Sequence, residues 1–166
     1  MKVLGLDIST KSTGWFMTKK RCGVIAPPLD LCIEKKLSYF RAKVRLLLHA
    51  FKPDVVVIED AYYQPRKGSI HTLKLLSQFA GVAAEVAGTN SVKVEFITAT
   101  QARKYCCGKH EGPFKKPEVF EYFVEKYGLD DWTFEKHNDI TDAMALSWAY
   151  REKAKLDKKK KKTGGK

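Results

Sequence analysis

The sequence predicts an α/β fold built on one mixed five-stranded sheet with helices on its faces. Three observations support this fold class. Two short runs are almost wholly apolar, as in strands covered on both faces. Apolar positions elsewhere recur at helical spacing, and strand-like and helix-like segments alternate along the chain. The 166 residues are enough for one substantial hydrophobic core.

The first 26 residues predict a three-stranded antiparallel meander. Residues 2–9 are nearly continuously apolar apart from one internal acid, Asp7, which is the pattern of a buried strand. Residues 12–18 and 21–26 are two further β-like runs. Because only short turns separate the three runs, antiparallel pairing is the simplest arrangement.

The remainder of the chain alternates between helical and strand-like patterns. An apolar stripe at helical spacing predicts a helix over 30–52, which Pro53 ends. The apolar run 55–59 predicts a second buried strand, and we expect this strand and a later one to be the two parallel strands that complete the sheet. We further expect a helix over 69–87, a strand over 92–98, a short helix over 100–106, a loop over 107–117, a helix over 117–127 and a last helix over 139–154.

The positive charge is concentrated at the C-terminal end. The formal net charge is +12, and residues 151–166 carry nine Lys or Arg against two acidic residues, a net of +7. The Lys run at 158–162 cannot bury apolar area, so we expect a domain over 1–154 and a flexible basic tail over 155–166. Such a tail favours a polyanionic partner, because its ammonium groups can displace counterions from phosphates. A solubilising segment or a cloning remnant is the alternative.

The apolar pattern and the cysteines exclude several protein classes. No apolar stretch approaches the roughly 20 residues that span a bilayer, so we expect no membrane partner. The N-terminus does not have the pattern of a secretory signal, and we expect a cytoplasmic protein. The four cysteines contain no C-x-x-C pair, which favours reduced thiols over a structural zinc site.

Two acidic residues stand in runs that should be buried. Asp7 lies inside the first apolar strand, and Glu59 ends the second. An ionised carboxylate in such a place is costly unless a cation or several donors compensate it. If the two strands are neighbours, both side chains emerge on one face of the sheet at a similar height. Asp60 would then point to the opposite face and is the weaker candidate.

Asp139 and Asp142 are three residues apart on the last predicted helix, so their side chains share a face. Asp139 has an alternative role as an acid in the first helical turn. Asp142 is surrounded by apolar positions, and the small residues Ala143 and Ala149 would let the helix approach the sheet closely. The carboxylates of the helix would then meet those of Asp7 and Glu59.

Four converging carboxylates suit hard divalent cations. Mg²⁺ and Mn²⁺ prefer oxygen ligands, and we expect Asp7, Glu59, Asp139 and Asp142 to bind two such ions per site. Two ions about 3.5–4 Å apart can activate a water molecule and stabilise the leaving oxygen during phosphodiester cleavage. The acids therefore predict a metal-dependent nuclease.

Three segments resemble the acidic motifs of RuvC-type Holliday-junction resolvases. They are Val3-Leu-Gly-Leu-Asp-Ile-Ser-Thr-Lys-Ser-Thr-Gly14, Val57-Ile-Glu59 and Asn138-Asp-Ile-Thr-Asp-Ala143, and the likeness extends to about Ala149. The resemblance implies a ribonuclease H-like fold and makes the four acids the catalytic metal ligands. It also implies a homodimer that nicks opposed strands of a branched, four-way DNA junction, leaving 5′-phosphate and 3′-hydroxyl ends without a small-molecule cofactor.

The same resemblance suggests further site residues. Tyr62, with Tyr63 beside it, lies where the family carries an aromatic residue that wedges into the junction; packing against its own helix is the alternative. Lys116, with Lys115 beside it, matches a basic residue placed to meet the scissile phosphate. Other basic residues are candidates for the DNA track, although solvated surface charge is the commoner role for each. These are Arg66, Lys67, Lys74, Arg103 and Lys104.

The sequence departs from the family pattern at two places and leaves three alternatives open. Ile8-Ser9-Thr10 replaces the usual Pro-Gly-Ser after the first acid, and the wedge position holds Tyr rather than Phe. The same acids could cleave an RNA–DNA hybrid or a structured RNA. The first motif also resembles the phosphate loop of sugar-kinase and actin-like domains, but 166 residues leave no room for their second lobe. A non-catalytic junction-binding module would gain nothing from buried carboxylates.

Overall fold

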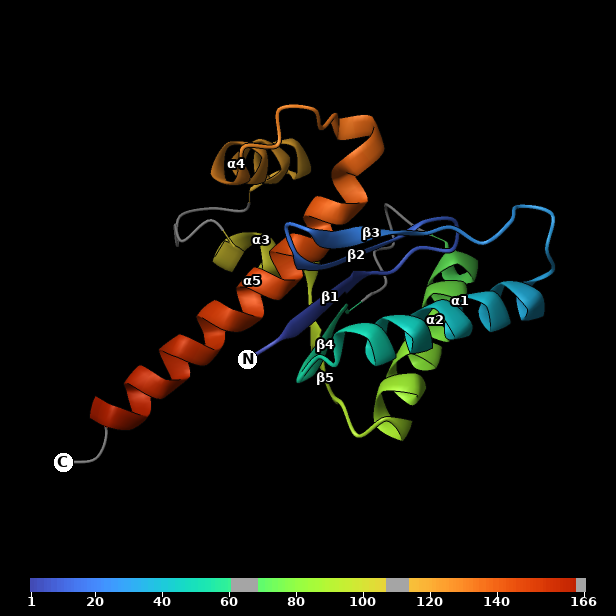
Figure 1. The fold of residues 1–166 in the computed structure, drawn as a ribbon, viewed down its shortest axis with the longest axis horizontal. Helices are drawn as coiled ribbons and strands as arrows, with labels where there is room; N and C mark the ends of the chain where they lie inside the picture. The colour runs from blue at the N-terminus through green and yellow to red at the C-terminus, as the bar shows by residue number, and fades with distance from the viewer. Residues whose placement is uncertain (61–68, 107–113, 164–166) are drawn as a thin grey trace.

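The computed structural model describes residues 1–60, 69–106 and 114–163, with side chains as far as residue 158. Strands and helices alternate as the sequence predicts, and Figure 1 shows their arrangement. In chain order they are β1 (Val3–Asp7), β2 (Thr13–Thr18), β3 (Arg21–Ile25), α1 (Ile33–Phe51), β4 (Val55–Glu59), α2 (Ile70–Thr89), β5 (Lys93–Ile97), α3 (Ala99–Cys106), α4 (Lys116–Tyr127) and α5 (Phe134–Thr163).

The five strands form one mixed sheet in the order β3-β2-β1-β4-β5. Short turns join β1, β2 and β3, which pair antiparallel, and this confirms the predicted meander. Strands β4 and β5 pair parallel to β1 and β4, because α1 and α2 carry the chain back across the sheet between them. The two apolar strands, β1 and β4, are therefore neighbours at the centre of the sheet.

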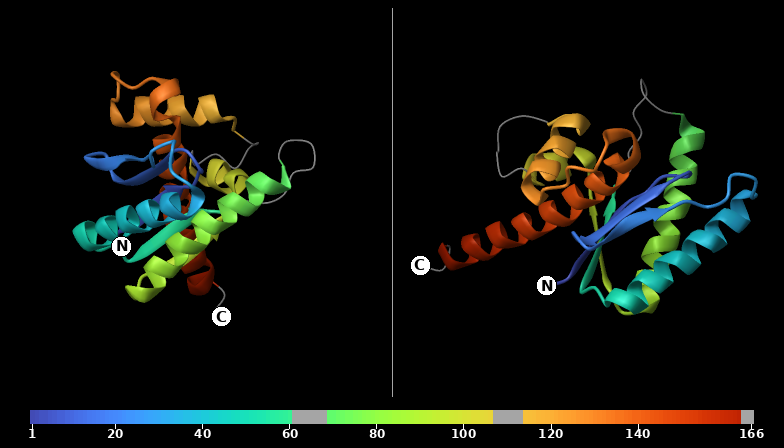
Figure 2. Two further views of the ribbon diagram at one scale, coloured as in Figure 1. Left: turned by 90° about the vertical axis from the view of Figure 1, so that its right-hand side faces the viewer. Right: turned by 45° about the horizontal axis from the view of Figure 1, so that its top comes forward.

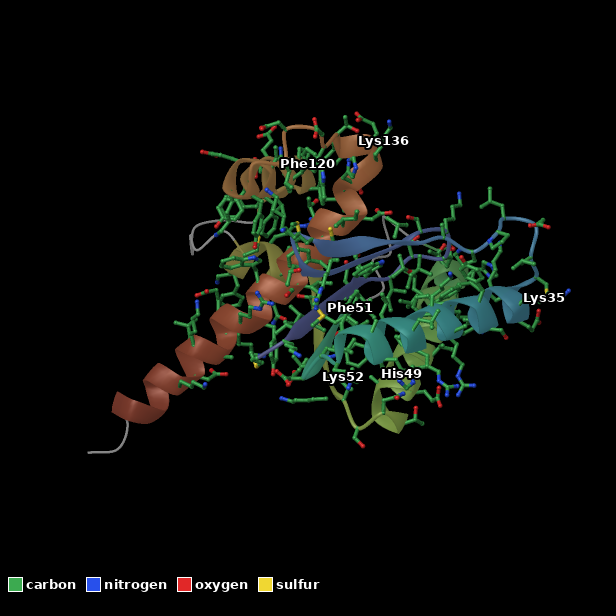
Figure 3. All side chains as sticks on the ribbon, in the orientation of Figure 1. Lys35, His49, Phe51, Lys52, Phe120 and Lys136 are labelled. Carbon is green, nitrogen blue, oxygen red and sulfur yellow. The ribbon has the colours of Figure 1, made fainter. Side chains whose placement is uncertain are left out.

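Helices cover both faces of the sheet, which explains why β1 and β4 are apolar on both sides (Figures 1 and 2). Helices α1 and α2 pack on one face, where Phe40 and Phe79 meet edge-on with ring centroids 5.2 Å apart. Helices α3, α4 and α5 pack on the other face. Side chains fill the space on both sides of the sheet in Figure 3.

Helix α5 lies directly on β1 and β2. A Cβ atom on Gly14 would stand 2.0 Å from the Asp139 carbonyl oxygen, and one on Gly5 would stand 2.1 Å from that of Ala143. One turn further on, the Ser147 hydroxyl donates to the Val3 carbonyl oxygen at 3.4 Å. The helix therefore runs antiparallel to β1, from the acid-bearing end of the strand to its beginning. Close approach was expected from the small residue Ala143, which is fully buried.

Helix α5 is longer than predicted at both ends. It begins at Phe134 rather than at residue 139. The backbone N–H of Thr133 donates to Nδ1 of His137 at 3.0 Å, and His137 also stacks on Trp132, so these contacts stabilise the earlier start. At its other end, the basic segment expected to form a tail continues the helix to Thr163. A packed helix is already nucleated, and Lys is a good helix former, so continuing it requires no new nucleus.

The remaining boundaries differ from the predictions by a few residues. Helix α2 extends to Thr89, two residues beyond the predicted end at residue 87, and Asn90 is its C-cap. Helix α4 begins at Lys116, one residue before the predicted start. Within the described residues, Cys22 and Cys32 are free thiols, in line with the prediction for them, and no helix is long and apolar enough to cross a membrane.

Candidate metal centre

Asp7 and Glu59 are brought together by the register of the two central strands. Val3 is paired with Val55 and Gly5 with Val57, so the parallel strands end side by side at the two acids. Glu59 lies close enough to Asp7 to raise the pKa of that carboxyl group. Both acids continue the strand face that packs against α5, since Val3, Val55 and Val57 belong to the core on that side. The prediction that these two side chains share a face is supported by this register.

Asp142 reaches the same place from α5. Only 8% of Asp7 and 7% of Asp142 is exposed, so both carboxyl groups are buried beneath the helix. Burial raises the pKa of Asp7 well above its ordinary value, and the hydrogen bond and charge of Glu59 and the charge of Asp142 raise it further. The charges of Glu59 and Asp142 therefore both act on the Asp7 carboxyl group.

Two basic side chains partly balance this negative charge. The Lys116 ammonium forms an ion pair with Oδ2 of Asp142. Burial raises the pKa of Asp142, while the charges of Lys116 and then Arg103 oppose that rise. The pKa of Lys116 is raised although burial lowers it, because the charges of Asp142, Asp7 and Glu59 together outweigh the effect of burial. The pKa of Lys116 therefore responds to all three carboxylates, and Arg103 lies close enough to Asp142 for its charge to lower the pKa of that carboxyl group.

Capping contacts at the start of α4 position Lys116 beside the acids. The backbone N–H of Lys115 donates to Glu118 Oε2 at 2.8 Å, and Pro117 occupies the first turn, where its missing N–H is not needed. Phe120 packs edge-on against Phe134, the first residue of α5, with ring centroids 5.6 Å apart. This contact fixes α4 against the helix that carries Asp142.

Asp139 lies at the edge of the cluster. Its backbone carbonyl sits over Gly14, which is paired with Asp7 in the sheet. Its half-buried carboxylate accepts a hydrogen bond from the Ser12 hydroxyl at 2.7 Å. Asp139 is thus close to the other three acids through its backbone, while its side chain is held by the β1–β2 turn.

The donor set suits a divalent cation chemically. Among the side chains that the structure describes, residues 1–60, 69–106 and 114–158, no three His, Cys, Asp or Glu form a group that could hold a metal ion as they stand. In this arrangement Lys116 is paired with Asp142. Burial and neighbouring acids raise the pKa values of Asp7 and Asp142, and a cation bound beside them would favour their charged forms. The metal-ligand roles expected for Asp7, Glu59, Asp139 and Asp142 stay predictions.

The residues predicted to contact DNA are distributed around this site. Lys115 and Lys104 are exposed on the same side of the sheet as the acids, at α4 and α3. Lys74 is exposed on α2, in the other helical layer. Tyr62, Tyr63, Arg66 and Lys67 lie outside the described residues.

Sequence reasoning missed the residues that allow the acids to converge. Gly5 and Gly14 leave space for α5 on the sheet. The sequence does not show that this helix packs against them. Ser12, which donates a hydrogen bond to Asp139, was predicted only as the first residue of the β-like run 12–18. Arg103 was predicted to contact DNA. In the structure its charge also lowers the pKa of Asp142.

A five-stranded mixed sheet with carboxyl groups on its two central strands and on the helix across them defines the ribonuclease H-like class of α/β proteins. The family model described as "Crossover junction endodeoxyribonuclease RuvC" matches residues 3–150. The chain belongs to this RuvC family.

Individual relatives agree with the family assignment. Crossover junction endodeoxyribonuclease RuvC of Syntrophomonas wolfei is 27% identical over 156 residues, which cover 89% of this chain and 86% of the relative. The protein of the same name from Dictyoglomus thermophilum is also 27% identical, over 90% of this chain and 96% of its own length.

Solved structures show the same fold at lower sequence identity. T. thermophilus RuvC in complex with a Holliday junction substrate matches with a TM-score of 0.76 and 17% identity, covering 94% of this chain and 96% of that one. The yeast mitochondrial Holliday junction resolvase Ydc2 matches with a TM-score of 0.67 and 13% identity, over 94% of this chain and 80% of its own.

Proposed function

We propose that this protein is a structure-selective endonuclease that resolves four-way DNA junctions in recombination and repair. It would hydrolyse one phosphodiester bond on each of two opposed strands and leave 5′-phosphate and 3′-hydroxyl ends. The observation that carries this proposal is the convergence of Asp7, Glu59 and Asp142 on one buried face, with Lys116 beside them, in a member of the RuvC family. The relatives' names and the junction bound to the Thermus protein supply the substrate class.

The acids would act as the ligands of Mg²⁺ or Mn²⁺, two ions per site. Bound there, such ions supply an activated water and stabilisation of the leaving oxygen. The chain's own contribution is to hold Asp7 and Glu59 at adjacent strand ends and Asp142 above them, in a place where burial strengthens electrostatic interactions. Ser12 fixes the carboxylate of Asp139 at the edge of the cluster.

Lys116 has two roles in this proposal. Without substrate, its ammonium stabilises the charge of Asp142. With substrate, the same side chain turns toward the scissile phosphate, because 44% of it is exposed and it can leave the carboxylate without leaving α4. Arg103 remains near Asp142, where its positive charge reduces the repulsion between the carboxylates and the phosphate.

Paired cuts require two sites, so we propose a homodimer in the cytoplasm. One polypeptide presents a single acid cluster, while resolution of a junction needs two symmetric nicks. Sedimentation of the protein alone and with junction DNA would measure the assembly. A single copy bound to each junction that still produces paired nicks would contradict the dimer.

Side-by-side cleavage assays test the function. A mobile four-way junction, a linear duplex of the same sequence and an RNA–DNA hybrid are incubated with protein and Mg²⁺ or Mn²⁺. We expect paired nicks in the junction and little cleavage of the duplex. A preference for the hybrid would instead indicate a ribonuclease, and junction binding without cleavage in any metal would indicate a non-catalytic module.

A further inference from the structure

The last 13 residues of α5 are a helical extension that the proposed active site does not use. The last buried residue of the helix is Ala149, and Lys93 of β5 lies over the ring of the next residue, Tyr150, at 5.8 Å. From Arg151 the helix continues to Thr163. Figures 1 and 2 show this end of α5 running past the sheet with no other described element beside it.

The extension is strongly basic on its exposed surface. Lys153, Lys155 and Lys158 are exposed, and only Lys155 has an acidic partner there, Glu152 at 2.6 Å. With the Lys residues that follow to position 162, the segment 151–166 carries a net charge of +7. Like charges spaced one turn apart on a helix repel one another. A polyanion alongside would relieve this repulsion.

The position of the extension relative to the acids is set by the helix itself. At 1.5 Å per residue, Lys158 lies about 24 Å along α5 from Asp142. The extension therefore cannot reach the phosphate that is cleaved. In B-DNA this distance corresponds to about 7 base pairs at 3.4 Å per step. Because α5 carries Asp142 at the site and the lysines at its far end, both are presented by one rigid element.

We propose that the extension is a second phosphate-binding surface, which holds a duplex arm of the DNA about 5–9 base pairs from the cleaved bond. This inference rests on the proposed function, because it names a contact of the same substrate. In this inference the Lys-rich segment contacts DNA from a fixed position along α5, and it does not act as a flexible tether. The extension contributes affinity and salt dependence and takes no part in hydrolysis.

The test compares a charge variant with a matched control. The triple variant Lys153→Gln, Lys155→Gln, Lys158→Gln removes three exposed charges from the extension. The control, Lys35→Gln, Lys43→Gln, Arg45→Gln, removes three exposed charges from α1 in the opposite layer. With four-way junctions that have 20-base-pair arms, we expect the extension variant to bind at least about tenfold more weakly at 150 mM salt. Its slope of log Kd against log salt should fall by about 2 to 3, and the control should match the wild type.

Arm length tests the location of the contact. On junctions whose arms are cut to about 5 base pairs and closed by hairpin loops, most of the extension would lie beyond the DNA. The difference between the wild type and the extension variant should then nearly disappear. A difference that is unchanged on short arms would overturn the proposed contact with the arm.

A helix-breaking variant tests the rigid placement. Ala154→Pro keeps every charge but interrupts the helix after its last packed turn. We expect it to lose most of the affinity lost by the charge variant, and wild-type affinity would overturn the placement along α5. If Ala154→Pro fails to fold, as judged by circular dichroism, Ala154→Gly provides the milder interruption.

Cleavage separates this inference from the proposed function. At saturating junction, all of these variants should cut at the wild-type rate. If the wild type cleaves junctions and the charge variant binds them as tightly as the wild type, the proposed role of the extension is overturned. The nuclease proposal is then left intact. Wild-type protein that binds junctions through the extension without cleaving them would overturn the nuclease proposal alone.

Discussion

Lys116, the first residue of α4, forms an ion pair with Asp142 on α5, and this pair places a cation among three carboxyl groups from separate parts of the chain. In the absence of a metal ion, the ammonium stabilises a cluster that would otherwise repel itself. The same pair must open before Asp142 can bind a metal ion. Lys116 therefore stabilises the metal-free protein and must leave Asp142 before the site can bind a metal ion.

Asp7→Asn should separate stability from activity. Removing a buried carboxylate that lies against Glu59 and Asp142 relieves repulsion, so we expect the metal-free variant to have a higher melting temperature at pH 7 than the wild type. Cleavage should fall by a factor on the order of 10³ or more, because a catalytic ligand is lost. Junction binding should be retained. Thermal unfolding, cleavage and gel-shift assays measure the three effects, and an unfolded variant would mean that Asp7 is structural.

The stability of the metal-free protein should decrease as pH rises above about 4. The pKa values of Asp7 and Asp142 are raised in the folded state, mainly by burial, so the folded protein retains protons that the unfolded chain releases. Their stabilising contribution is complete below the ordinary aspartate pKa and is lost as pH rises through the raised values. Unfolding by urea between pH 3.5 and 8 measures this slope.

Mg²⁺ should reverse part of this pH dependence, because it binds the deprotonated carboxylates. With 10 mM Mg²⁺, the loss of stability toward pH 8 should become smaller, and Asp7→Asn should not show the metal effect. The raised pKa of Lys116 does not alter the sign in this range, since its ammonium stays protonated throughout. A wild-type profile that is independent of pH and metal would contradict the convergence of the acids.

Lys116→Gln should reduce the cleavage rate by about 10²-fold at saturating junction, because the phosphate loses a positive charge in a buried setting. It should also lower the stability of the metal-free protein, since Asp142 is left without its ion-pair partner. Single-turnover cleavage and thermal unfolding give the two readouts. Lys35→Gln on α1, in the opposite helical layer, is the control and should leave both unchanged.

Gly5→Ala should destabilise the protein by about 3 kcal/mol. The added methyl group would overlap the Ala143 carbonyl oxygen, which belongs to the backbone of α5, so the helix must move off the sheet. Cleavage should fall as Asp142 moves away from Asp7. Gly88→Ala is the matched control, because nothing lies within 4 Å of its Cβ and alanine favours the helix. Equal stability of the two variants would show that α5 does not lie directly on β1.

Ser12→Ala should weaken metal binding by about 10- to 100-fold without a large loss of stability. The hydroxyl donates to Asp139 at 2.7 Å and fixes the direction of that carboxylate at the edge of the cluster. Titration of Mn²⁺ by calorimetry measures the change. Ser77→Ala, whose hydroxyl bonds only within α2, should bind Mn²⁺ like the wild type.

Local sequence patterns were sufficient to predict the sheet and the helices around it. Alternation and apolar runs defined the strands, and the register of β1 with β4 follows from their lengths and burial. The positions of Asp7 and Glu59 at adjacent strand ends were predictable for the same reason. The start of α5 at Phe134 was not, because it depends on the contacts of His137 with Thr133 and Trp132.

The electrostatic details of the site could not be read from the sequence. The pairing of Lys116 with Asp142 depends on how α4 packs against α5, through Phe120 and Phe134 among other contacts. The hydrogen bond from Ser12 to Asp139 joins residues 127 positions apart. Such relationships arise only when the helices are placed in three dimensions. The catalytic and metal-binding roles of these residues, and the domain boundary at residue 154, stay predictions.

Anomalous diffraction from crystals of the protein soaked in Mn²⁺ tests the proposed metal centre most directly. We predict anomalous density between Asp7, Glu59 and Asp142, with the Lys116 side chain turned away from Asp142. Manganese that binds elsewhere, with Lys116 still paired to Asp142 and no density among the three carboxylates, would contradict the proposed centre.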